Sequence, residues 1–130
     1  MTRHELADAM IRGKNTKGVQ EHKDFYIHVE PSFMNRPAFC NACANGCALI
    51  GYYDGEYERA YAAFRERESE INRSSDYNEY YFSEPEVLAD LLDISPALAI
   101  EIEFKHLNGM PIQQIAAWLK SSEGEGDHES

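Results

Sequence analysis

The sequence has few cysteines, no long apolar run and fewer basic than acidic residues. All three cysteines lie within eight positions, whereas a fold held by disulfides needs cysteines spread along the chain, so we expect free thiols or metal ligands. No apolar run approaches the roughly eighteen residues of a membrane-spanning helix, and the first five residues do not begin like a signal peptide. We therefore expect a cytoplasmic protein without membrane association.

The excess of acidic over basic residues lies in the second part of the chain. Residues 1–53 hold six basic and five acidic side chains, whereas residues 54–130 hold six basic and eighteen acidic ones, a net charge of −12. Proteins that bind nucleic acid directly use Lys and Arg to displace counterions from phosphates, so this balance argues against direct nucleic-acid binding. It favours a protein partner with a basic surface, or high solubility alone.

Local motifs of catalysis are absent as well. The sequence contains no nucleophile elbow, no phosphate-binding loop and no dinucleotide-binding fingerprint. Carboxylate pairs such as Glu66 and Glu70 are more often a solvated helix face than an acid/base pair. An active site built from distant residues would leave no such motif, so enzymatic activity stays open, although we favour a non-enzymatic role.

Apolar residues at helical spacing predict a mainly α fold, a compact bundle of five to six helices. A single domain is expected over residues 1–120, followed by an acidic tail over residues 121–130 that we expect to be disordered because it has no apolar residue. Thr2 and Glu5 form a capping box for a helix over residues 3–12. Residues 25–30 alternate like a strand, with residues 80–82 as a partner in a small two-stranded β-hairpin.

Four further helices are predicted between residues 54 and 120. Asp54 is expected to cap a helix that reaches Ile71, and Ser83 to cap a short helix that carries Val87, Leu88, Leu91 and Leu92. A helix that starts at Ser95 and Pro96 should be followed closely by one that starts at Pro111. The residues expected to face the core from these last two helices are Ala97, Ile100, Phe104, Leu107, Ile112, Ile115, Ala116 and Leu119.

The stretch from Pro37 to Gly55 is predicted to form the central helix. Helical spacing would place Cys40, Cys43, Cys47 and Ile50 on one stripe, beside a stripe of small residues that lets another helix approach closely; the small residues are Ala44, Ala48 and Gly51.

Two interpretations of the cysteines remain open. Buried free cysteine is common in protein cores, and this interpretation, which we favour, needs no cofactor. The alternative is a zinc site formed by Cys40, Cys43 and Cys47, with His28 or His22 as fourth ligand.

Two segments resemble known proteins. The helix Cys47-Ala48-Leu49-Ile50-Gly51, together with the closing residues 106–108 and 115–119 (His-Leu-Asn and Ile-Ala-Ala-Trp-Leu), resembles a loose group of small uncharacterised bacterial and phage proteins. That resemblance implies no particular activity. Residues 109–119 are also similar to the first half of a helix-turn-helix unit, but an acidic tail follows where the recognition helix would be required.

Acidic residues and tyrosines gather in the second part of the chain. Seven of the eight tyrosines lie between residues 52 and 81, and tyrosine suits protein interfaces because it combines an apolar face with a polar tip. We predict a small acidic binding or inhibitory protein, of phage or mobile-element origin, that blocks a basic nucleic-acid-binding surface of a host defence complex. The alternative is a small zinc-binding or enzymatic domain. The predicted interface residues are Glu66, Glu70, Tyr77, Tyr80, Tyr81, Glu84, Glu86 and Asp90.

Overall fold

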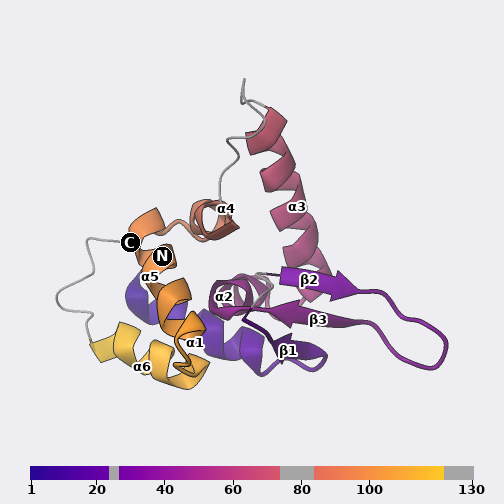
Figure 1. The fold of residues 1–130 in the computed structure, drawn as a ribbon, viewed down its shortest axis with the longest axis horizontal. Helices are drawn as coiled ribbons and strands as arrows, with labels where there is room; N and C mark the ends of the chain where they lie inside the picture. The colour runs from indigo at the N-terminus through magenta and orange to yellow at the C-terminus, as the bar shows by residue number, and fades with distance from the viewer. Residues whose placement is uncertain (24–26, 74–83, 122–130) are drawn as a thin grey trace.

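Six helices and three short strands make up the part of the chain that the computed structural model describes, residues 1–23, 27–73 and 84–121 (Figure 1). The prediction of a mainly α fold with a small β element is confirmed. The elements are α1 (Arg3–Lys14), β1 (Val19–Glu21), β2 (Ile27–Glu30), β3 (Phe39–Ala42), α2 (Ala44–Tyr52), α3 (Tyr57–Arg73), α4 (Glu84–Leu92), α5 (Pro96–Leu107) and α6 (Ile112–Ser121).

Helix α2 is the centre of the fold, and all its residues from Ala44 to Gly51 are buried. The predicted close approach of another helix occurs here, because α1 crosses α2 at two glycines. A Cβ atom on Gly51 would lie 1.8 Å from the backbone oxygen of Ala9, and one on Gly13 would lie 1.8 Å from that of Cys47. Only residues without a Cβ atom allow the two backbones to come this close.

The prediction that Cys40 lies on the central helix is wrong, because residues 39–42 form strand β3 and α2 begins only after Cys43. β3 lies between the other two strands, parallel to β1 and antiparallel to β2. A helix at residues 39–42 would leave both of these short strands without a hydrogen-bonding partner, and such strands are not stable alone. The expected stripe of three cysteines is thus divided between a strand, a helix cap and a helix.

The predicted strand over residues 25–30 is observed as β2, over residues 27–30. Its partner in the structure is β3, and the sheet has three strands where two were expected. The proposed partner segment 80–82 lies outside the described residues.

The N-terminal and last helices agree well with the predicted spacing. The capping box of Thr2 and Glu5 is present, and α1 continues two residues beyond its predicted end. The apolar side of α6 is buried as expected, and α6 packs against α1. Near this contact the Arg3 guanidinium lies 4.6 Å from the ring centre of Trp118, and Lys120 forms an ion pair with Asp8 at 2.8 Å.

The other helix starts agree in part. Asp54 does not cap α3, because it has a left-handed backbone with φ of 59° in the turn before the helix, and α3 starts at Tyr57. Ser95 begins α5 as predicted. Its side chain caps the helix, because it accepts a hydrogen bond from the backbone N–H of Leu98. Ser83 lies outside the described residues, as do residues 122–130 of the predicted tail, whereas Ser121 belongs to α6.

Candidate interaction surface

Five of the predicted interface residues lie on α3 and α4, which contact each other (Figure 1). Glu66, Glu70 and Asp90 are exposed, and Glu86 is half-buried. Tyr77, Tyr80 and Tyr81 lie outside the described residues, and of Glu84 only the backbone position at the start of α4 is described. The structure therefore places Glu66 and Glu70 on one helix and Glu86 and Asp90 on its neighbour, without placing the tyrosines.

Arg67 joins the two helices across this surface. Its Nε donates a hydrogen bond to Asp90 Oδ2 at 2.6 Å, and its Nη1 donates to Glu70 Oε1 at 3.2 Å. The hydrogen bond to Asp90, followed by that to Glu70, raises the pKa of the Arg67 guanidinium. Two of the predicted carboxylates thus share a cation from their own chain, which reduces the negative potential around them.

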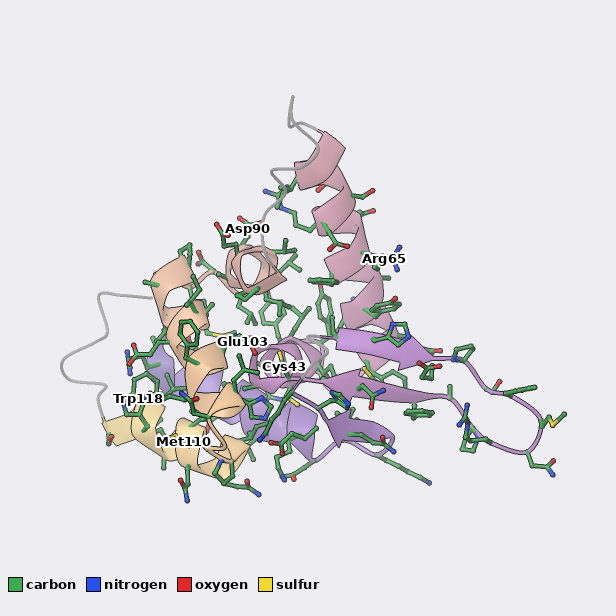
Figure 2. The ribbon with its side chains drawn as sticks, viewed as in Figure 1. Cys43, Arg65, Asp90, Glu103, Met110 and Trp118 are labelled. Atoms are coloured by element: carbon green, nitrogen blue, oxygen red, sulfur yellow. The ribbon has the colours of Figure 1, made fainter. Side chains whose placement is uncertain are left out.

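The acidity of the surface comes mainly from α4. Helix α3 contains four glutamates and four arginines, so its side chains carry no net charge. Figure 2 shows one of these arginines, Arg65, on the side of α3 that faces away from Asp90. In contrast, α4 contains three carboxylates and neither lysine nor arginine. The remaining concentrations of negative charge lie in residues 74–83 and 122–130 of the sequence.

A depression of about 270 Å³ lies at the junction of these helices. Carboxylates of Glu86 and Asp90 border it together with the Arg67 guanidinium, and the rest of its lining is apolar. The apolar lining consists of Ile71, Ile94 and Pro96. A long basic side chain combines an apolar stem with a charged end, which matches this distribution of surfaces.

The three cysteines are buried, and none of them forms a disulfide. Burial raises the pKa of the Cys40 thiol to about 11. Burial followed by nearby negative charge also raises the pKa values of Cys43 and Cys47 well above their usual range. At neutral pH these groups are thiols, whereas nucleophiles and metal ligands are thiolates. The microenvironment is that of core cysteines.

The strand register separates the proposed fourth zinc ligand from the first. Cys40 pairs with Val29, and His28 pairs with Asn41, so Cys40 and His28 point to opposite faces of the sheet. His28 instead contacts Glu30, with Nε2 3.0 Å from the carboxylate oxygen, and its ring meets that of Tyr61 edge to face. Within residues 1–23, 27–73 and 84–121 no group of three or more Cys, His, Asp or Glu side chains is placed to hold a metal ion.

A buried polar cluster lies where the cysteine region meets α5, as Figure 2 shows for Cys43 and Glu103. The Cys43 thiol donates to Glu103 Oε2 at 3.0 Å, and Asn45 Nδ2 donates to the same oxygen at 3.1 Å and to the backbone oxygen of Ala99 at 2.9 Å. Next to it, His106 Nε2 lies 2.7 Å from Glu21 Oε2. The cluster couples α5 to the start of α2 and to β1.

Sequence reasoning missed this cluster because it assigned the wrong face of α5 to the core. The helix buries Leu98, Ala99, Ile102, Glu103 and His106. The residues predicted to face inward, Ala97, Ile100, Phe104 and Leu107, are exposed, with Phe104 at 60% and Leu107 at 46%. Both faces of α5 contain apolar residues, and the polar partners that Cys43, Asn45 and Glu21 supply make burial of the mixed face favourable.

A groove of about 540 Å³ lies beside the sheet, away from α4 and α5. Lys17, Arg36, Phe39 and Tyr57 are part of its lining, and the Tyr57 hydroxyl donates to the backbone oxygen of Ala38 at 3.2 Å. The neighbouring β2–β3 loop, which extends away from the body in Figure 1, exposes Met34 at 91%. This basic and apolar region was not singled out from the sequence.

None of the helices in the described part of the chain is long and apolar enough to cross a membrane. A comparison with known protein families, curated proteins and solved structures finds no match to this chain.

Proposed function

We propose that this protein is a small binding factor that acts by occupying a basic surface of another protein. The observation that carries the proposal is the depression at the junction of α3 and α4, where two carboxylates border an apolar lining. It lies on the part of the chain with the strongest negative charge. The alternative zinc-binding or enzymatic function has weaker support, because the cysteines are buried and protonated.

The depression suits one arginine or lysine side chain of the partner. The methylene groups of that side chain would lie against Ile94 and Pro96, and its charged end would lie between Glu86 and Asp90. Because Arg67 already donates to Asp90, the incoming cation has to share this carboxylate or displace Arg67. Binding of this kind depends on charge, so its association rate falls as salt rises.

The partner class that we propose is a cytoplasmic protein with a nucleic-acid-binding channel. Clustered carboxylates can take the positions of phosphates among the lysines and arginines of such a channel, which would inhibit it. Inhibition of a host defence complex by a phage or mobile-element protein has this chemistry. Direct binding of nucleic acid to the same surface is disfavoured because its net charge has the same sign as that of the phosphates.

The test is a comparison of charge-reversed variants in affinity capture from a host lysate. Glu86→Lys with Asp90→Lys should lower the association rate for the captured partner by about tenfold or more, since exposed charges control steering more than stability. Glu30→Lys with Glu58→Lys is the matched control, because it changes the net charge equally on β2 and in the first turn of α3, outside the residues that line the depression. Capture should be strong at low salt and weak at roughly 0.5 M salt, where the Debye length, the range over which exposed charges attract each other, is only about 4 Å.

Two results would overturn the proposal. One is the capture of no partner at either salt concentration. The other is a partner whose association responds equally to both double variants, because this would show dependence on total charge and not on the surface of α4.

A further inference from the structure

Helix α5 presents an apolar stripe to the solvent, formed by Ile100, Phe104 and Leu107. The helix contacts α2, α4 and α6 through its other sides. Exposed apolar side chains are ordinary when they are scattered, but three large ones at positions i, i+4 and i+7 form a continuous surface of the kind that helices use to bind partners. We propose that this stripe is covered by the α5 helix of a second copy of the chain, in an antiparallel arrangement.

The position of the charges beside the stripe identifies the second copy. With about 100° between successive residues, Phe104 lies at the centre of the exposed side, with Ile100 and Leu107 on one flank and Glu101 and Lys105 on the other. Opposite charges therefore share one flank. Within one chain Lys105 Nζ lies 3.9 Å from Glu101 Oε2 and 4.4 Å from the ring centre of Trp118 on α6, so an ion pair with a second copy has to compete with these two contacts.

A two-fold axis perpendicular to two facing helices makes them antiparallel and brings like flanks together. The axis can pass near residue 103, so that Glu101 of one copy lies level with Lys105 of the other, and two such ion pairs form. In the same register Ile100 lies within one residue of the level of the second copy's Leu107, and the two Phe104 rings meet near the axis. One register thus aligns both the apolar side chains and the opposite charges. A parallel pair of helices does not form these ion pairs, because it places the charged flank of one copy beside the apolar flank of the other.

The net charge of −11 makes this association depend on salt in a distinctive way. Two equally charged copies repel each other at long range, and salt screens that repulsion while it affects the buried apolar contact little. The dimer should therefore tighten as salt rises from about 0.05 to 0.5 M, over which the Debye length becomes several-fold shorter. Binding of a basic partner through α4 has the opposite dependence, so the two proposals fail or succeed separately.

The first experiment is sedimentation equilibrium of the purified chain at roughly 1 µM to 1 mM, where an interface of one helix is expected to associate weakly. Phe104→Asp should weaken the dimer more than tenfold, because it removes the central aromatic contact and adds two charges at the axis. Met34→Asp is the control, since this side chain is more exposed than Phe104 and lies on the β2–β3 loop. Circular dichroism of both variants checks that the fold is unchanged.

The second experiment tests the register. Glu101→Lys and Lys105→Glu should each weaken the dimer, because each places like charges opposite one another, and the double variant should restore it by exchanging the two signs. A chain that remains monomeric at about 1 mM in 0.5 M salt overturns the proposal, as does a dimer that Phe104→Asp leaves intact. A dimer in which the charge exchange gives no rescue refutes the antiparallel register and with it the argument for the second copy.

Discussion

The crossing of α1 and α2 makes Gly51→Ala the most decisive test of the fold. The added Cβ atom would lie 1.8 Å from the backbone oxygen of Ala9, whereas a close carbon–oxygen contact is roughly 3.3 Å, so the helices must separate by about 1.5 Å. Such a gap forfeits most of the dispersion energy of the atoms that face each other across it. The cost falls on a contact made by backbone atoms, which cannot rotate away.

Two effects of opposite sign set the magnitude for Gly51→Ala. Overpacking costs about 1–3 kcal/mol where side chains can yield and more where they cannot, while alanine is preferred over glycine within a helix by about 1 kcal/mol. We expect a net loss of about 3 kcal/mol in the free energy of unfolding, a large part of the 5–15 kcal/mol typical of domains. Gly13→Ala should behave alike, and the double variant should lose less than the sum because the helices separate only once.

Urea denaturation followed by circular dichroism measures these changes. Gly109→Ala is the comparison, since its φ of 99° strains an alanine by about 1 kcal/mol while no atom lies within 4 Å of the added Cβ. If Gly51→Ala were as stable as the wild type or more so, helix propensity alone would govern this position, and the close crossing would be refuted.

Three other outcomes follow from the cysteine region. Cys47→Ser should lower the free energy of unfolding by about 1–3 kcal/mol and Cys47→Ala by less, measured by urea denaturation. The serine hydroxyl would be buried, and the nearby acceptor, the Ala42 backbone oxygen, lies 3.9 Å from the sulfur, too far for a good hydrogen bond from the shorter side chain. Unfolded thiols ionise near pH 8.5–9, whereas folded Cys40 holds its proton to about pH 11. Stability should therefore be full below about pH 8.5 and fall between about pH 9 and about pH 11, by up to about 1.4 kcal/mol per pH unit and thiol. Cys47→Ala should lessen that slope, and an unchanged slope would contradict its origin in thiols. Elemental analysis should show no stoichiometric zinc, and stable binding of one equivalent, lost with stability in chelator, would reverse this expectation.

Local signals predicted the helices well where one interpretation of the pattern dominated. The capping residues Thr2 and Ser95 begin helices as expected, and the apolar spacing of α6 gives its buried side. Residues 39–42 differ because three of the four, Cys40, Asn41 and Ala42, are small and suit either a helix or a strand. The choice depends on β1 and β2, whose need for a partner is a tertiary effect that a local pattern does not contain.

The candidate surfaces were predictable to different degrees. The carboxylates of α3 and α4 could be gathered from the sequence, but the neutralising role of Arg67 depends on where the two helices cross. On α5 two apolar faces competed, and the packed one includes Glu103 and His106. The spacing of Ala99, Ile102, Glu103 and His106 offered that alternative, yet only the positions of Cys43 and Asn45 on another element show why it is preferred.

The packing of α1 between α2 and α6 has a consequence for folding during synthesis. At roughly 5–20 residues per second, about 5–20 s pass between completion of α1 at residue 14 and the start of α6 at residue 112. Helix α1 can dock on α2 within the first part of that interval, because their contacts join residues about forty positions apart. The side of α1 that contacts Leu119 and Trp118 stays uncovered until α6 has been synthesised. A nascent chain therefore exposes this side of α1 to chaperones during that interval.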